Sequence, residues 1–262
     1  MQLSIVIVNY KTKGLLRQCL RGIYQHPPHI AFEVIVVDNG SRDGSVAMVT
    51  EEFPQVRSLA LSSNLGYARG SNTGLALAQG AFLLLLNPDI VVEDDNLDRL
   101  YRFAMDHPRA GVVGPQLLNP DRTIQHSAFR WYRVLTPLCR RTMLQRTAWG
   151  KRELQRFLML DWDHGTERSV EWFMSSCVLV RREALADVGT FDERFFVYFA
   201  DTDFCRRMWL KGWQVYYTPR VQFVHYYRRE SAEDWWLTGI HIHDWLQYLW
   251  KWRRQSPPIA KG

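Results

Sequence analysis

The sequence predicts an α/β fold in which helices flank a mostly parallel central sheet. Two observations support this prediction. Continuous apolar runs bounded by turn residues recur through the first half of the chain, and segments with helical spacing of apolar residues separate them. An apolar run without polar alternation indicates a strand covered on both faces. Because strands and helices alternate, the strands are expected to lie parallel in one sheet.

The predicted elements follow in chain order. Four apolar runs are predicted as buried strands, at residues 3–9, 32–40, 56–61 and 81–89. Between them, apolar residues recur every three or four positions, as on the buried face of a helix: Leu15, Leu16, Cys19, Leu20 and Ile23 in one segment, and Leu97, Leu100, Tyr101 and Ala104 in another. These segments are the expected covering helices.

The second half of the chain differs in character. Residues 130–168 are rich in Arg, Trp and Leu without strand alternation, and we interpret them as a variable helical insertion. Residues 170–182 are predicted as a further strand and 201–211 as a short helix. Ser231 and Asp234 form a capping-box variant that is expected to open an aromatic C-terminal helix.

Composition excludes several classes of protein. A chain of 262 residues with 47% hydrophobic content can bury a sizeable core, so a disordered protein is excluded. Its four cysteines contain no CxxC pair, which argues against a zinc cage or a disulfide framework. The net charge of +6 suits nucleic acid, phosphorylated substrates or an anionic lipid surface. The start of the chain has no signal-peptide pattern, and no apolar run approaches the roughly 20 residues of a membrane span. A cytoplasmic location is therefore expected.

Polar, turn-forming residues follow the predicted strands where each ends. These residues are Asn9 and Tyr10, then 38–41, 64–66 and 87–89. In an open parallel sheet, ligands bind outside the carboxyl ends of the strands, so these side chains should share one edge. Asn, Asp, Gly and Ser also form ordinary turns, which is the alternative for any one position. Four such ends on one edge favour a binding site.

Two carboxylates at this edge, Asp38 and Asp89, are candidates for binding a nucleotide and a metal ion. Asp38 can accept a hydrogen bond from the N3–H of uracil or thymine, or from a ribose hydroxyl, although helix capping is the alternative. Asp89 follows Pro88, and one hard carboxylate there can hold Mg²⁺ or Mn²⁺ together with diphosphate oxygens and water. In isolation, residues 87–89 would read as a turn.

A third group of residues lies near a predicted helix start. Asp201 and Asp203 are two positions apart, so they point in different directions from the helix. One is expected to cap the helix and the other to be available as a general base. The glycines at 66, 70, 74 and 80 could form a phosphate loop or permit close helix packing. The sequence contains no GxGxxG, GxxxxGK[ST], GxSxG or HExxH motif.

Taken in order, five segments resemble the motif set of family 2 glycosyltransferases with the GT-A fold, and in particular its bacterial rhamnosyltransferase-like branch. The segments are SIVIVNYK, VIVVDNGSRDGS, NLGYARGSNTGLALAQG, LLLLNPD and GTFDERFFVYFADTDFCRR. The resemblance covers residues 3 to about 228, which implies a Rossmann-like catalytic domain over 1–228. Within it, residues 130–168 are expected on the acceptor side, and 229–262 form a C-terminal helical extension.

The resemblance also implies roles for individual residues. Asp201 matches the general base, and Asp89 matches the last acid of the metal motif. Asn87 stands where that motif usually has its first acid. His225 matches a histidine that completes the metal or phosphate site, with a structural histidine as the alternative. The nucleotide and donor are implied to bind at Asn9, Tyr10, Asp38, Asn64, Gly66, Arg69, Asn72 and Asn87.

Two positions depart from the family pattern. Ala200 stands where the family has an acid, which leaves Asp203 or Glu193 as candidates for that acid's role. Residues 174–177, Met-Ser-Ser-Cys, replace a small-residue motif that usually contains Gly-Ala, and serines still allow a close approach of the acceptor. Acceptor choice is assigned to the insertion at residues 130–168.

The expected activity is inverting transfer of a sugar from a dTDP- or UDP-linked donor, with rhamnose from dTDP as the favoured case. The acceptor is expected to be a saccharide or a lipid-linked saccharide in bacterial surface polysaccharide synthesis, with Mg²⁺ or Mn²⁺ as cofactor and no nucleic acid partner. A catalytically silent sugar-nucleotide-binding or scaffold protein is the alternative, because of Ala200. A sugar-1-phosphate nucleotidyltransferase ranks last, since the early Gly-rich loop of that class is missing.

The C-terminal segment carries a separate hypothesis. Five of the eleven tryptophans lie between Trp235 and Trp252, and the segment ends in basic residues at 251, 253 and 254. This pattern suits a helix that lies on an anionic membrane, at the inner face of the cytoplasmic membrane. A helix packed on the catalytic domain, or in an oligomer, is the alternative.

Overall fold

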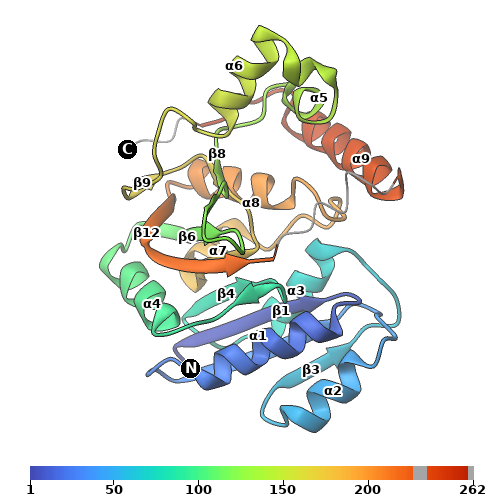
Figure 1. Ribbon diagram of the computed structural model, residues 1–262, viewed down its shortest axis with the longest axis vertical. Helices are drawn as coiled ribbons and strands as arrows, with labels where there is room; N and C mark the ends of the chain where they lie inside the picture. The colour runs from blue at the N-terminus through green and yellow to red at the C-terminus, as the bar shows by residue number, and fades with distance from the viewer. Residues whose placement is uncertain (227–234, 259–262) are drawn as a thin grey trace.

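The computed structural model describes residues 1–226 and 235–258 (Figure 1). Its main sheet runs in the order β3-β2-β1-β4-β11-β6-β12-β5, with β7 beside β6 and β9 beside β12. The strands of this sheet are β1 (Leu3–Asn9), β2 (Phe32–Asp38), β3 (Arg57–Ala60), β4 (Phe82–Leu86), β5 (Ile90–Val91), β6 (Ala110–Leu118), β7 (Ile124–Gln125), β9 (Arg168–Ser169), β11 (Cys177–Arg181) and β12 (Gln214–His225). A second, two-stranded sheet pairs β8 (Ala128–Phe129) with β10 (Trp172–Phe173).

Helices cover both faces of the main sheet, as predicted: α1 (Lys13–Gln25), α2 (Ser45–Glu52), α3 (Tyr67–Leu77), α4 (Asn96–Asp106), α7 (Arg182–Val188) and α8 (Ala200–Leu210). The remaining helices lie beyond the sheet (Figure 1): α5 (Thr136–Arg141), the 3₁₀ helix η1 (Met143–Arg146), α6 (Ala148–Phe157) and α9 (Trp235–Trp252). Two apolar clusters fill the space on either side of the sheet, and alternate residues of β1 enter opposite clusters. This two-sided burial is the reason that the strands read as continuous apolar runs.

Strands β1 to β4 run parallel, so their carboxyl ends share one edge. Strand β11 enters antiparallel between β4 and β6, which makes the sheet mixed beyond β4. The glycines of α3 serve packing: a Cβ on Gly70 or Gly74 would approach side-chain atoms of Val8 or Val6 to 2.7 or 2.3 Å. The packing alternative for these two glycines therefore holds, and α3 lies close against β1.

Two predicted strands differ from the observed ones. The predicted buried strand at 56–61 is an edge strand, β3, whose one partner among the described strands is β2, and three of its four residues are exposed. The predicted strand at 170–182 is two strands, because β10 pairs with β8 whereas β11 enters the main sheet. Residues 174–176 form the connection between them, and this connection contributes to the site described below.

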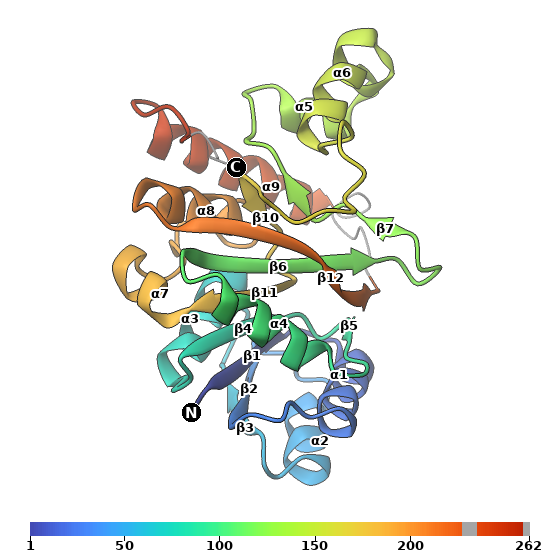
Figure 2. The same cartoon turned by 90° about the vertical axis from the view of Figure 1, so that its left-hand side faces the viewer.

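The insertion and helix α9 lie at one end of the molecule, far from α2 and β3 (Figures 1 and 2). Residues 130–168 contain α5, η1 and α6, as the helical prediction required. The predicted capping box at Ser231 and Asp234 lies outside the described residues, and so does the boundary at 228/229. Within the described residues, no helix is long and apolar enough to cross a membrane. All four cysteines are free and buried.

Candidate active site

Asn9, at the end of β1, and Asp38, at the end of β2, meet at the sheet edge. The Asn9 amide nitrogen donates to Asp38 Oδ2 at 2.8 Å and to Ser41 Oγ at 3.2 Å. The backbone N–H of Ser41 donates to Asp38 Oδ1 at 2.9 Å. Asp38 is therefore held in place by its neighbours and is not the N-cap of α2, which begins at Ser45. Tyr10 follows with a side chain that is 40% exposed.

The loop before α3 is tied to the same edge. The Asn39 amide nitrogen donates to Asn64 Oδ1 at 2.9 Å and to the carbonyl of Gly66 at 3.1 Å. Gly66 has a φ of +86°, and a Cβ there would lie 2.4 Å from the carbonyl oxygen of Phe196. Only glycine fits this position without displacing the loop that precedes α8.

Arg69 and Asn72 project from α3 toward that same loop. The Asn72 amide nitrogen donates to the Phe191 carbonyl at 2.9 Å, and its oxygen accepts from the Phe191 N–H at 2.9 Å. Arg69 Nε lies 3.2 Å from Glu193 Oε2, and both side chains are about half exposed. Asn72 thus tethers the loop, whereas Arg69 remains at the surface beside the site.

His225, at the end of β12, faces Asp89 across the sheet edge. Their Nε2 and Oδ1 atoms are 3.2 Å apart, and the His225 side chain is buried. Gln125 fixes the other side of the ring, because its Oε1 lies 2.6 Å from His225 Nδ1. The Gln125 amide nitrogen donates to Asn119 Oδ1 at 3.0 Å, so its oxygen must face the histidine. Nδ1 therefore carries a hydrogen.

This arrangement fits a divalent cation. The 3.2 Å separation of Asp89 Oδ1 and His225 Nε2 allows both atoms to coordinate one cation. Asp89 and His225 together supply one oxygen and one nitrogen ligand, and diphosphate and water can complete such a shell. Among residues 1–226 and 235–258 no cluster of three or more His, Cys, Asp or Glu side chains forms a complete protein cage.

Asp201 lies in the first turn of α8, beside the connection at residues 174–176. Its Oδ1 accepts from the Thr202 N–H at 2.8 Å, and the Ser175 N–H also bonds to the carboxylate. Burial raises the pKa of Asp201 to about 6, and these backbone hydrogen bonds oppose the rise. A half-buried carboxyl with this pKa can exchange a proton near neutral pH.

The connection at residues 174–176 lies between Asp201 and the loop at residues 87–89, which contains Asn87 and Asp89. Ser176 accepts, through its carbonyl, a hydrogen bond of 2.7 Å from the Asn87 N–H. Ser175 accepts one of 3.0 Å from the Tyr67 hydroxyl on α3. Asp201, Asn87 and the start of α3 are thus positioned by one short segment of backbone.

Asp203 points away from Asp201, as the spacing predicted. It is fully buried and bonds to Arg207 at 2.9 Å, to Trp252 at 2.9 Å and to Lys251 at 2.6 Å. Three partners from α8 and α9 engage its oxygens, so it cannot also act on a substrate. Of the two candidates for the role of the family's acid, only Glu193 remains accessible.

Asp244 of α9 shapes the loop that leads to Asp201. Its Oδ2 accepts the backbone N–H groups of Phe196, Val197 and Tyr198 at 3.0 to 3.1 Å. The following residue, Phe199, is buried with a φ of +62°, a conformation that non-glycine residues rarely adopt. Neither Asp244 nor Gln125 was predicted from sequence, since each acts on residues far away in the chain.

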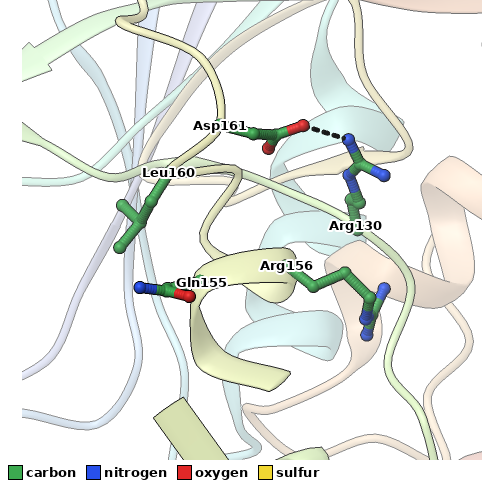
Figure 3. Close-up of a pocket in the computed structure, with 5 residues that line it drawn as sticks. All are labelled: Arg130, Gln155, Arg156, Leu160 and Asp161. Atoms are coloured by element: carbon green, nitrogen blue, oxygen red, sulfur yellow. Dashed lines mark hydrogen bonds and ion pairs between the residues drawn. The ribbon is translucent and has the colours of Figure 1, made fainter. Parts of the chain in front are cut away.

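A separate pocket of about 450 Å³ lies within the insertion (Figure 3). Arg130 is paired there with Asp161 at 2.8 Å, and Arg156 with Glu153 at 2.7 Å. Both guanidinium groups already have carboxylate partners, so the pocket has no unpaired charge to attract an anion. It contains none of the residues at the strand ends.

Comparisons with known proteins agree with this geometry. The family described as "Glycosyl transferase family 2" matches residues 4–189. The chain belongs to glycosyl transferase family 2. It is 32% identical over 220 residues to the N-acetylglucosaminyl-diphospho-decaprenol L-rhamnosyltransferase of Mycobacterium tuberculosis, with 77% of this chain and 68% of the relative covered. It is 23% identical to the rhamnosyltransferase WbbL of Escherichia coli, with 87% and 84% covered.

Solved structures show the same fold for this family 2 chain. Mannosyltransferase PcManGT from Pyrobaculum calidifontis, in complex with GDP-Man and Mn²⁺, matches with a TM-score of 0.64 and 18% identity, covering 98% of this chain and 66% of that one. TarS 1-349 of S. aureus in complex with UDP matches with a TM-score of 0.59 and 18% identity, covering 86% and 60%. The chain spans 36% of the longer TarS chain. The expected GT-A fold and family are confirmed.

Proposed function

We propose that this glycosyltransferase moves rhamnose, with inversion, from a dTDP- or UDP-linked donor to a saccharide or lipid-linked acceptor. The relatives that act as rhamnosyltransferases support the sugar, and the decaprenol-linked name of one of them supports a lipid-linked acceptor. The observation that carries the reaction is Asp201, a half-buried carboxyl with a raised pKa beside the connection that positions Asn87.

In the proposed reaction, Asp201 accepts the proton of the acceptor hydroxyl while that oxygen attacks the anomeric carbon. The bond between this carbon and the diphosphate breaks on the opposite face, and the electron pair leaves with the diphosphate, so the configuration inverts. Asn9 and Asp38 would bind the base and ribose, with Tyr10, Asn64, Gly66 and Arg69 around them. Asp89 and His225 would hold Mg²⁺ or Mn²⁺, which neutralises charge on the leaving diphosphate when bound.

Binding of a nucleotide panel tests the site. Thermal shift and calorimetry with dTDP, UDP, GDP and their sugars, each with Mn²⁺, Mg²⁺ or EDTA, should show metal-dependent binding of dTDP or UDP species. Absence of binding to every nucleotide would contradict the proposed donor site. The Asp201→Asn variant should keep nucleotide binding and lose transfer.

A silent binding or scaffold protein is the second candidate, because a buried alanine stands at position 200 where the family has an acid. This candidate predicts equal turnover, close to the uncatalysed background, for the unmodified chain and Asp201→Asn. The scaffold candidate is favoured if the unmodified chain and the Asp201→Asn variant both bind nucleotide and neither transfers sugar to any acceptor tested.

A further inference from the structure

The insertion exposes an unusual number of large apolar side chains. Val134, Leu135, Leu138, Met143, Leu144 and Trp149 are between 37% and 65% exposed, all within sixteen consecutive positions. Every residue from 142 to 149 is exposed. We call these six apolar residues, together with the exposed basic residues Arg146, Lys151 and Arg152, the insertion face. Apolar groups gathered in this way usually mark an interaction site.

Its charge is of one sign. Residues 133–152 contain six Arg or Lys residues and no Asp or Glu. Arg146, Lys151 and Arg152 are exposed, and within the described part of the chain they form no ion pair. The nearest acid in sequence, Glu153, is buried and pairs with Arg156 at 2.7 Å and with Arg133 at 3.2 Å. Arg146, Lys151 and Arg152 therefore place uncompensated positive charge beside the apolar side chains of the insertion face.

The opposite side of the insertion is well packed, so the exposure does not come from a loose segment. Cys139 and Phe157 are fully buried, and Glu153 accepts a hydrogen bond from the Thr136 hydroxyl. Thr147 caps α6 by accepting from the Gly150 N–H at 3.0 Å. Helices α5 and α6 thus present one side to the protein and the insertion face to the outside.

We propose that the insertion face docks on an anionic lipid bilayer. A segment with Trp, Leu and Met beside Arg and Lys suits the headgroup region, where apolar groups enter the acyl boundary and cations meet lipid phosphates. A second copy of this chain is a poorer partner, because a two-fold contact would place like charges opposite each other without acids to pair them.

Helix α9 extends the same end of the molecule (Figures 1 and 2). It buries His241, Asp244 and Tyr248 and leaves Trp235, Trp250 and other apolar residues exposed. The packing of α9 is thus structural on one side, and its exposed side can add to membrane contact. The insertion face holds the greater density of basic residues, so we expect it to dominate.

The purpose of this docking rests on the proposed function, because a lipid-linked acceptor lies in a membrane. The test of docking does not rest on the proposed function, since it contains neither donor nor acceptor.

Co-sedimentation of the full chain is measured with vesicles of phosphatidylcholine alone and of phosphatidylcholine with phosphatidylglycerol. Two triple variants alter the insertion face: Arg146→Glu, Lys151→Glu and Arg152→Glu, or Met143→Ser, Leu144→Ser and Trp149→Ser. The exposed pair Met105→Ser and Arg109→Glu serves as a matched control elsewhere on the surface.

The unmodified chain should pellet with anionic vesicles and should stay largely in the supernatant with neutral vesicles. Since each basic residue near an anionic surface contributes roughly fivefold, loss of three should lower binding by about 100-fold or more. The apolar variant should lower binding to both vesicle types, and the control should bind normally. A cooperative thermal unfolding transition of each variant verifies that it is folded. Equal binding of all variants, or no binding by the unmodified chain, overturns the proposal, as does a dimer that the insertion-face variants dissociate.

Discussion

Lowering the pH from 7.5 to 5 should remove most of the transfer activity, because Asp201 must be ionised to accept a proton. With a pKa of about 6, roughly 97% of the carboxyl is ionised at pH 7.5 and about 9% at pH 5, so kcat/KM should fall about 10-fold. At the ordinary value of 3.8, the same change in pH would lower kcat/KM by less than about 10%. The two cases are easily distinguished.

The assay follows sugar transfer at low donor and acceptor concentration with saturating Mn²⁺. Metal-dependent nucleotide binding is measured at both pH values as a control for the integrity of the donor site. A fall in kcat/KM with intact binding assigns the loss to the general base. A loss of less than twofold, with binding intact, would refute the assignment of Asp201.

The matched variant Asp201→Asn separates charge from shape. It should lower kcat by roughly 10²- to 10⁴-fold, the usual contribution of a positioned base. Because folding raises the pKa of Asp201 from 3.8 to about 6, the stability that the neutral carboxyl contributes is lost as the pH rises through about 6, and this loss is complete at pH 7.5. A neutral amide of the same size should therefore raise Tm at pH 7.5, whereas an unchanged or lower Tm would contradict the burial argument.

Four further changes test the supporting structure. Gln125→Leu should weaken Mn²⁺ binding about 10- to 100-fold by calorimetry, because His225 loses its orienting acceptor, while metal-free nucleotide affinity stays the same. Asp244→Ala leaves three backbone N–H groups of the loop without their acceptor and should cost about 2 to 4 kcal/mol in urea unfolding; a cost below about 1 kcal/mol would contradict the clamp. Gly66→Ala should cost about 1 to 3 kcal/mol from its φ alone. Ala200→Glu should lower Tm without raising turnover, since the position is fully buried; a gain in turnover would show that the missing acid limits the enzyme.

The strand ends of the site could be predicted because they follow from local pattern and one rule of topology. Asn9, Asp38 and Asn87 each come directly after a continuous apolar run, and parallel strands bring these ends to one edge. The different directions of Asp201 and Asp203 followed from helical geometry. The role of Asp201 rested on the resemblance, because spacing alone assigns no chemistry.

Other features depend on contacts between distant parts of the chain. Gln125 and His225 are 100 positions apart, and Asp244 lies 46 to 48 positions from the N–H groups that it binds. The break between β10 and β11 arises because each finds a different partner strand. The exposure of β3 likewise follows from its place at the edge of the sheet.

The sequence by itself determined the α/β class, the family and the sheet edge at which the candidate site lies, because periodicity, turn residues and ordered motifs are local properties. Only the tertiary structure decided which groups orient His225, which hold the loop before Asp201, and which side of the insertion stays exposed. These depend on the pairing of residues remote in sequence, and a hydrogen bond or buried face between such residues leaves no periodic signal in either partner.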